Sequence, residues 1–482
     1  MKKLKFSFIN LGCNKNLVDT QFLLWNIFSL SWNNPNYEID YINDPYDDEV
    51  EYVFLNTCGF ISSGREEMFE EINKLLNTWK KIYLLWCALQ YFEKYASLTK
   101  GGSSDKSEGV GFKAWKKIPP TPLNKGGETW VLNEIEQWEK IVKNQNIHML
   151  SRSDWNNISV EQIFNWYDSK KFWESPIFNG IRAYTNIDYW FEYLKIAEWC
   201  NNHCTFCIIP KIRWKQKSLH IEEIVQQARE LVNNWTKEII LLAQDTNRYW
   251  LDLYGKSMLF ELLEELEKIE WDFMYRILYL YPDILTLKHL EKLTKLKKFI
   301  PYFDIPLQHI NPEILKRMWR FYDKNHILKL LDFIDKNFKE KFVRTNIIVW
   351  FPWETEKEFD ELCDFLKNYH FDNVALFEYH DEPLAESSKL DNKIDESEIH
   401  RRFEILKWII NNKEWKIKNE KWNGVWFIMW FEWDEKDPVI IVRPWLHAPE
   451  IDEYDQIKLK NIKWIFSDDE NLDIWSKILY KK

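Results

Sequence analysis

The stretch Cys200-Asn201-Asn202-His203-Cys204-Thr205-Phe206-Cys207 places three cysteines at the spacing C-x3-C-x2-C. It comes directly after residues 192–198, a run that predicts a strand. Cysteine thiolates are the usual ligands of iron–sulfur clusters. A four-iron cluster held by three cysteines keeps one iron open for a further ligand, which suits chemistry better than electron transfer alone. The stretch therefore predicts a cluster-binding loop at the end of a strand.

A zinc site is the alternative interpretation of the same three cysteines. Structural zinc usually has four protein ligands, often supplied as paired C-x2-C units. His203 is a candidate for the fourth ligand, but it directly precedes Cys204, and binding to the same ion there would be cramped. We therefore interpret His203 as a loop residue.

Length and composition indicate a globular protein of two to four domains. The chain has 482 residues, 45% of them hydrophobic and 29% charged, and no apolar run approaches the roughly 18 residues of a membrane span. The first residues predict a strand instead of a signal peptide. Seven cysteines, an odd number, argue against a disulfide framework, so we expect the reducing cytoplasm. We also expect a monomer with no membrane contact. A net charge of −11 argues against a generally basic nucleic-acid surface.

Three further cysteines, Cys13, Cys58 and Cys87, each follow an apolar run that predicts a strand. Helical patterns at 17–29 and 66–77 separate these runs, and this alternation predicts a parallel sheet. The carboxyl ends of such strands share one edge, where ligands gather. Three cysteines in equivalent positions favour a second cluster, and three buried structural cysteines are the alternative.

Residues 97–131 interrupt this first domain, which we place at 1–175. Six of the twelve glycines lie there, without apolar periodicity, so the segment predicts a disordered surface insertion. A helix is expected afterwards, near 160–169.

A second alternation of strands and helices predicts a six-unit parallel barrel that does not close fully, in a domain at 186–412. The expected strands are 192–198, 238–244, 274–280, 300–305, 342–349 and 373–379. In barrels of this kind the chemistry lies at the carboxyl ends of the strands. Four polar residues on these strands are candidates for binding a cofactor, with a structural role as the alternative for each: Gln244, Asp245, Arg276 and Asp304. Cys363 lies on the apolar face of a predicted helix, so we assign it to the core.

The C-terminal part, 413–482, predicts a small β domain. Short strand-like runs lie at 425–431, 439–442 and 456–459, after a charged helix near 396–419. Acidic residues outnumber basic ones from 421 onward, so this domain is not basic.

Together the two sets of three cysteines resemble the methylthiotransferase family of radical S-adenosylmethionine (SAM) enzymes. The supporting strings are Leu11-Gly12-Cys13-Asn14-Lys15-Asn16, Asn56-Thr57-Cys58-Gly59-Phe60 and Phe206-Cys207-Ile208-Ile209-Pro210. The resemblance implies an N-terminal methylthiotransferase domain, a radical SAM barrel and a C-terminal TRAM domain. It also implies two 4Fe–4S clusters. Cys200, Cys204 and Cys207 would hold the catalytic one, which binds and cleaves SAM. Cys13, Cys58 and Cys87 would hold the other, which carries the sulfur.

Within that family we favour the branch that adds a methylthio group to the β-carbon of an aspartate in the twelfth small-subunit ribosomal protein. The supporting strings are Leu17-Val18-Asp19, Ala243-Gln244-Asp245-Thr246 and Ala448-Pro449-Glu450-Ile451-Asp452. A non-basic terminal domain fits a basic protein substrate better than tRNA. The alternatives are the branch that modifies isopentenyl-adenosine in tRNA, and a non-catalytic iron–sulfur protein. An electron donor is an implied partner.

Tryptophan is abundant and glycine scarce, at 28 and 12 residues of 482. The resemblance leads us to expect glycine at six positions that hold tryptophan: Trp86, Trp199, Trp214, Trp250, Trp350 and Trp353. We therefore hypothesise that the gene uses UGA as a glycine codon and that UGA is rendered as tryptophan in this chain. On this hypothesis the tryptophans near the SAM pocket should be strained. A chain that is truly rich in aromatic residues is the alternative.

Overall fold

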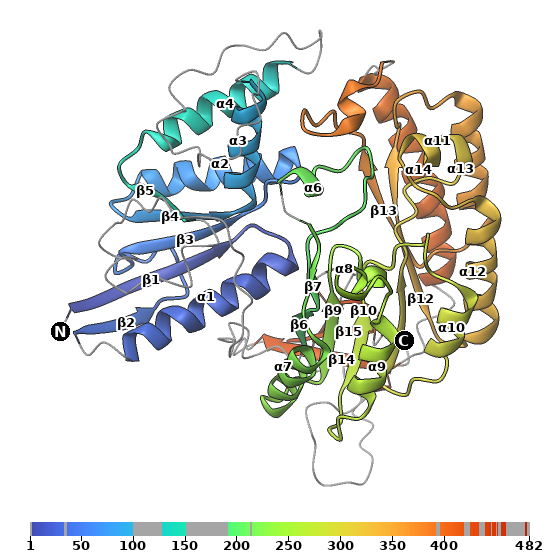
Figure 1. The fold of residues 1–482 in the computed structure, drawn as a ribbon, viewed down its shortest axis with the longest axis horizontal. Helices are drawn as coiled ribbons and strands as arrows, with labels where there is room; N and C mark the ends of the chain where they lie inside the picture. Colours follow the sequence, from blue (N-terminus) through green and yellow to red (C-terminus); the bar gives the residue numbers. More distant parts are fainter. Residues whose placement is uncertain are drawn as a thin grey trace.

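An N-terminal parallel sheet and a six-stranded parallel barrel lie side by side in the computed structural model (Figure 1). The structure describes residues 2–32, 36–99, 128–150, 191–212, 215–391, 396–418, 425–432, 439–444, 446–449, 451, 455–458 and 478–479. None of the described helices is long and apolar enough to cross a membrane.

The N-terminal sheet has five parallel strands in the order β2-β1-β3-β4-β5. Their bounds are β1 Lys2–Asn10, β2 Tyr37–Tyr41, β3 Tyr52–Thr57, β4 Lys81–Trp86 and β5 Ile147–Leu150. Every residue of β3 is buried, as expected for a central strand covered on both faces. The sequence predicted β1, β3 and β4 but not the two edge strands.

Four helices cover this sheet: α1 Asn14–Trp32, α2 Ser62–Leu76, α3 Cys87–Thr99 and α4 Glu128–Val142. In α2 the buried positions 65, 68, 69, 72 and 75 recur at helical spacing, so one stripe faces the sheet. Part of the expected insertion is helical, because α3 extends to Thr99 and α4 begins at Glu128. Residues 100–127 and the helix expected near 160–169 lie outside the described residues.

The barrel sheet is parallel throughout, in the order β13-β12-β11-β10-β9-β6. Its strands are β6 Phe191–Lys195, β9 Glu238–Leu242, β10 Met274–Ile277, β11 Phe299–Asp304, β12 Phe342–Val349 and β13 Asn373–Glu378. All six expected strands are present. In the described part of the chain no pairing joins β6 to β13, so the barrel is open, as predicted.

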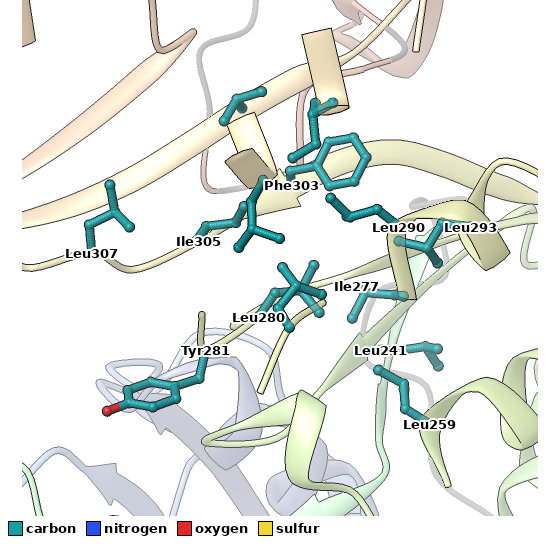
Figure 2. Close-up of a cluster of buried hydrophobic side chains, with 14 of the residues drawn as sticks. Leu241, Leu259, Ile277, Leu280, Tyr281, Leu290, Leu293, Phe303, Ile305 and Leu307 are labelled. Carbon is teal, nitrogen blue, oxygen red and sulfur yellow. The ribbon is translucent and has the colours of Figure 1, made fainter. Parts of the chain in front are cut away.

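Helices cover the outer face of the barrel and bury its largest apolar cluster. They include α7 Ile221–Asn233, α9 Leu259–Glu267, α10 Leu287–Leu293, α12 Lys324–Asn337, α13 Glu356–Asn368 and α14 Glu396–Lys418. Figure 2 shows part of this cluster, where Leu241 and Ile277 of the sheet meet Leu259 and Leu290 of the helices. Cys363 of α13 belongs to the same cluster, which agrees with its assignment to the core.

A four-stranded antiparallel sheet in the order β16-β15-β14-β17 forms the C-terminal part. Its strands are β14 Val425–Glu432, β15 Val439–Pro444, β16 Asp455–Lys458 and β17 Ile478–Leu479. The segment after β15 docks at the amino ends of the barrel strands, where His447 meets Phe342 with ring centroids 4.8 Å apart. This agrees with the predicted small β domain, and its TRAM identity stays a prediction.

Candidate functional site

The C-x3-C-x2-C loop lies between the two strands of a short hairpin. The hairpin strands are β7 Ala197–Glu198 and β8 Lys217–Ser218, which pair antiparallel and enclose the loop with α6 Ile209–Ile212. Because β7 continues directly from β6, the loop lies at the carboxyl end of the first barrel strand. This is where the sequence predicted it.

Backbone hydrogen bonds pin the middle of this loop to distant parts of the barrel. The amide of Thr205 donates to the carbonyl of Met318 at 3.1 Å, and its own carbonyl accepts from the amide of Ser387 at 2.8 Å. The Thr205 hydroxyl donates to the carbonyl of Arg317 at 2.8 Å. The loop between Cys204 and Cys207 is therefore held by segments more than 100 residues away.

The three loop cysteines interact electrostatically. Burial, followed by the charges of Cys204 and Cys200, raises the pKa of the Cys207 thiol. Burial and then the Asp245 charge raise the pKa of Cys200 to about 12. Without a partner these thiols stay protonated, and a metal that binds thiolates would displace the protons. The set is thus a partly buried group of soft ligands.

The second set lies at the carboxyl ends of three adjacent strands. Cys58 directly follows β3 and Cys87 directly follows β4, while Cys13 precedes α1 and its carbonyl accepts from the amide of Leu17 at 3.1 Å. Burial and then the charge of Cys87, with a smaller effect from Cys13, raise the pKa of Cys58 to about 11. The three cysteines are therefore brought together, as predicted.

Close backbone packing surrounds this second set. A Cβ on Gly59 would lie 2.3 Å from the carbonyl oxygen of Cys87, and one on Gly64 would lie 3.2 Å from the sulfur of Cys58. The Asn16 side-chain amide donates to the Cys87 sulfur at 3.5 Å. The two glycines let the cysteine loops approach each other.

The two cysteine sets face each other across the domain boundary. Ile208 and Ile212, which follow Cys207, share a buried cluster with Ala88 and Leu89 of α3, the helix that begins at Cys87. Burial, Asp304 and Cys13 together raise the pKa of the Tyr279 hydroxyl, so Cys13 lies near the carboxyl end of β10. Both sets therefore open toward the same end of the barrel.

Lys15 joins the two domains at this point. Its ammonium donates to the carbonyl of Ala243, just past β9, at 3.3 Å and lies 4.3 Å from the centroid of the Tyr279 ring. Deeper in the interface, buried Lys195 of β6 pairs with Asp19 of α1 and with Glu198. These contacts between the two domains could not be predicted from the sequence.

No three His, Cys, Asp or Glu side chains among the described residues are grouped tightly enough to hold a single metal ion. This does not fit the zinc interpretation of the cysteine loop. Cysteines that bind different corners of a four-iron cluster are spaced more widely than the ligands of one ion. With three soft ligands on each side of the boundary, the residues present fit two such clusters.

Two of the four candidate cofactor-binding residues have buried oxygens with no hydrogen-bond partner. These are Oε1 of Gln244 and Oδ1 of Asp245, which lie two and three residues beyond the end of β9. The other Asp245 oxygen accepts from the Asn202 amide at 2.7 Å, which links the strand end to the cysteine loop. Burial raises the pKa of Asp245 to about 6, against the effects of Asn202 and Arg248. Unpaired buried polar atoms at a strand end fit a polar ligand.

The other two candidates make structural contacts. Arg276 is fully buried, pairs with Glu238 at the start of β9 and donates to the carbonyl of Leu446 at 2.9 Å. Asp304 binds Arg344 at 2.9 Å and accepts from the amide of Tyr279 at 2.9 Å. Arg276 thus lies at the amino end of the barrel, away from the cysteine loop. The sequence could not predict which end of the barrel this side chain would reach.

Two residues that the sequence analysis missed lie at the site. Asn346 alternates with Arg344 on the inner face of β12, and its Oδ1 is buried without a partner. Arg320 lies with Nη1 at 3.7 Å from the sulfur of Cys204. Polar residues at alternate positions of a predicted barrel strand would have indicated Asn346, whereas nothing local marks Arg320.

A parallel barrel that carries a three-cysteine loop after its first strand defines a radical SAM enzyme, and the profile of the Radical SAM superfamily matches residues 194–366. The ribosomal protein uS12 methylthiotransferase RimO of Dictyoglomus thermophilum is 35% identical, over 93% of this chain and 91% of that protein. RimO of Clostridioides difficile is 33% identical over 94% of this chain and 93% of its own length. The chain belongs to the RimO family of methylthiotransferases.

Proposed function

We propose that this enzyme adds a methylthio group to the β-carbon of an aspartate in ribosomal protein uS12, using two 4Fe–4S clusters and SAM. The observation that carries the proposal is that both three-cysteine sets open toward one end of the barrel, joined there by the bond from Lys15 to the Ala243 carbonyl. A sulfur carrier and a SAM-cleaving centre must both reach the same substrate carbon, and this arrangement provides that.

The two sets of cysteines would hold clusters with different roles. Cys200, Cys204 and Cys207 would hold the cluster that, when bound, supplies the electron for cleaving SAM. Cys13, Cys58 and Cys87 would hold the cluster that carries the sulfur. Gln244, Asp245 and Asn346 offer buried oxygens as acceptors for the polar groups of SAM. Ile208 and Ile212, which follow Cys207, pack with Ala88 and Leu89 of α3 and so help to hold the two sets in place.

The charge of the C-terminal domain supports a protein substrate. Acidic residues outnumber basic ones from 421 to 482, whereas binding of an RNA backbone normally relies on clustered Lys and Arg. A ribosomal substrate would place the enzyme in the cytoplasm. An external electron donor is required, and the protein would act as a monomer.

SAM cleavage is the first test. The protein is loaded with iron and sulfide without oxygen, then given SAM and a reductant, and 5′-deoxyadenosine is measured. We expect Cys204→Ala to abolish its formation and Cys58→Ala to spare it while ending methylthio transfer. Cys363→Ala, in the core away from both sets, is the matched control and should keep both activities. Product formation by Cys58→Ala would disprove the role of the second set, and a cluster-loaded protein that yields no 5′-deoxyadenosine would be a non-catalytic iron–sulfur protein.

Substrate identity needs a separate measurement. Mass spectrometry of uS12 and of bulk tRNA after coexpression should show the added methylthio mass on uS12. A mass gain confined to tRNA would overturn the proposed substrate and leave the radical SAM chemistry intact.

A further inference from the structure

Tryptophan occupies backbone conformations that glycine normally adopts. In the described part of the chain, eight residues other than glycine have positive φ, and six of them are tryptophan: Trp199, Trp235, Trp250, Trp319, Trp350 and Trp353, with φ from 59° to 69°. Residues with a Cβ rarely adopt this region, and Asn, Asp and His are the usual exceptions. So strong a bias toward the bulkiest side chain needs a specific cause.

Two of the six lie in helix C-terminal motifs that strongly favour glycine. After α7, the amide of Trp235 donates to the carbonyl of Val232 and the next amide, of Thr236, donates to that of Leu231, both at 3.1 Å. After α11 Pro312–Arg317, Trp319 and Arg320 make the same pair of bonds, to Lys316 at 3.1 Å and Leu315 at 2.8 Å. Both pairs are those of the Schellman motif, whose left-handed residue is usually glycine.

A third tryptophan lies in a tight turn. Phe351, Pro352, Trp353 and Glu354 form a turn closed by a bond from the Glu354 amide to the Phe351 carbonyl at 3.0 Å. Proline at the second position and positive φ at the third are the features of a type II turn, which requires glycine or asparagine there.

The other three tryptophans share an unpartnered polar atom. Trp199, Trp250 and Trp350 each have an indole nitrogen that is buried without a hydrogen-bond partner. Buried indole N–H groups usually find an acceptor. Trp199 directly precedes Cys200 and Trp350 directly follows β12, so both lie at the carboxyl ends of barrel strands beside the SAM site. Glycine would remove the unpaired donor and open space for a ligand.

We propose that the functional protein carries glycine at positions 199, 235, 250, 319, 350 and 353, encoded by UGA. One codon reassignment accounts for six independent backbone outliers, and also for 12 glycines beside 28 tryptophans in 482 residues. Of the other positions where glycine was expected, Trp86 does not have positive φ and Trp214 lies outside the described residues. The proposal does not depend on the function of the protein.

The decisive test reads the gene and the protein together. UGA codons at the six positions, with glycine in the peptides of protein isolated from the source cells, are the expected result. Trp408, on the exposed face of α14, is the internal control and should be UGG, because glycine is unfavourable within a helix. UGG codons at the six positions, or UGA codons with tryptophan in the peptides, would overturn the proposal, and so would UGA at 408, because glycine codons would then not follow backbone geometry.

A different observation concerns Arg320, which is buried against the cysteine loop. Its Nη1 lies 3.7 Å from the Cys204 sulfur, and its Nε donates to the Tyr322 hydroxyl at 2.7 Å. Its Nη2 donates to the Pro306 carbonyl, and the guanidinium lies 4.1 Å from the centroid of the Tyr281 ring. These contacts fix the group in one orientation, directed at one cluster ligand.

The geometry points to Arg320 as a positioning residue for the cluster at Cys200, Cys204 and Cys207, an inference that rests on the proposed function. A fixed cation that donates to a ligand sulfur stabilises the added negative charge of the reduced cluster. Hydrogen bonds to the sulfurs are among the factors that set the potentials of such clusters. Arg320 would therefore raise the reduction potential and hold Cys204 in place.

The test compares Arg320→Gln, Arg320→Lys and the wild type by redox titration followed by electron paramagnetic resonance. Arg317→Gln is the matched control, because Arg317 is the last residue of α11, three positions before Arg320, but donates to the carbonyl of Trp353 instead of a sulfur, at 2.7 Å. We expect Arg320→Gln to lower the midpoint potential well beyond Arg317→Gln, with Arg320→Lys in between. Loss of the cluster from Arg320→Gln alone, with an unchanged circular dichroism spectrum, would also support the role.

The outcomes separate this inference from the proposed function. Clusters present in every variant with equal potentials would overturn the role of Arg320 and leave the proposed function standing. If the wild-type protein bound no cluster, the proposed function itself would be wrong.

Discussion

Each of the six tryptophans with left-handed backbone carries a conformational cost. A residue other than glycine in the left-handed region costs roughly 1–3 kcal/mol, so six such tryptophans cost about 6–18 kcal/mol together. A domain typically has a net stability of about 5–15 kcal/mol. The cost is therefore as large as the whole stability of an ordinary domain, which favours glycine at these positions.

Trp235→Gly tests this cost where no site is involved. The Trp235 side chain is 72% exposed, so few contacts are lost and relief of the left-handed strain dominates. We expect the free energy of unfolding to rise by about 1 kcal/mol in a urea titration. Trp408→Gly makes the same change at a 67% exposed helical position and should lower it by a similar amount. Equal effects of the two changes would contradict the strain argument.

We expect the polarity of Asn346 to serve a ligand and not the fold. Its buried Oδ1 has no partner, so Asn346→Leu should leave thermal stability equal or higher. Loss of one buried hydrogen bond to SAM should weaken SAM binding by about 1–3 kcal/mol, roughly 5- to 150-fold, in calorimetry with the cluster-loaded protein.

Thr345 is the opposite control on the same strand. It points to the outer face and bonds the carbonyl of Ile305 at 2.8 Å, so Thr345→Val should destabilise the fold and keep SAM affinity. If Asn346→Leu instead melted early and bound SAM normally, Asn346 would be structural.

Helix caps determine where the helices around the carboxyl end of the barrel begin. Thr355 caps α13 with its hydroxyl accepting from the Glu358 amide at 3.3 Å, and the Glu358 carboxylate accepts from the Thr355 amide at 2.7 Å. This capping box directly follows the turn that contains Trp353. The cap therefore sets where the turn ends and the helix begins.

Thr355→Ala should lower the free energy of unfolding by about 1 kcal/mol, because an amide of the first turn loses its acceptor. Thr294→Ala is the matched control, since its hydroxyl only donates back to the Glu291 carbonyl near the end of α10. It should change stability by less than about 0.5 kcal/mol in the same denaturant titration. A Thr355→Ala protein as stable as the wild type would mean that packing alone positions α13.

The whole molecule is held together by a buried ion network across the domain boundary. Arg65 of α2 binds Glu134 of α4 at 3.0 Å and Glu382, beyond β13 of the barrel, also at 3.0 Å. The same guanidinium donates to the carbonyl of Gly59 at 3.2 Å, beside Cys58. The network thus couples the position of one cysteine loop to the barrel.

This network predicts a dependence of stability on pH. Burial, opposed by Arg65 and assisted by Glu382, raises the pKa of Glu134 to about 7 from an ordinary value near 4.5. Between these values the folded protein keeps a proton that the unfolded chain loses, so stability falls as the pH rises through this window. The loss approaches about 3 kcal/mol above pH 7.

Glu134→Gln should remove that loss, since the amide stays neutral at every pH. Unfolding titrations at pH 5 and pH 7.5 should show the variant gaining on the wild type by roughly 2–3 kcal/mol between the two. Glu139→Gln, on the same helix and 3.5 Å from Lys143 at the surface, should follow the wild type. Parallel curves for wild type and Glu134→Gln would show that the network is not proton-linked.

The sequence by itself determined the features that depend on local pattern. The alternation of apolar runs and helical periods predicted the parallel strands, because backbone pairing and burial impose those periods on the chain. The cysteine sets could be located as well, since Cys58 and Cys87 directly follow strands and the loop from Cys200 to Cys207 begins two residues after β7. Cofactor binding by Arg276 stays a prediction, and the structure shows this side chain paired with Glu238 and bonded to the carbonyl of Leu446. A polar residue within a strand does not reveal which end of the barrel its side chain reaches.

Only the tertiary structure decided which residues meet. Arg320 lies 116 positions from Cys204, and Lys15 lies 228 positions from Ala243, yet each pair is in contact. The same holds for Trp235 and Trp319, whose left-handed backbone appears only once the helices before them end in a defined motif. The physical reason is that side-chain contacts and backbone dihedral angles depend on how whole elements pack, and no short window of sequence contains that information.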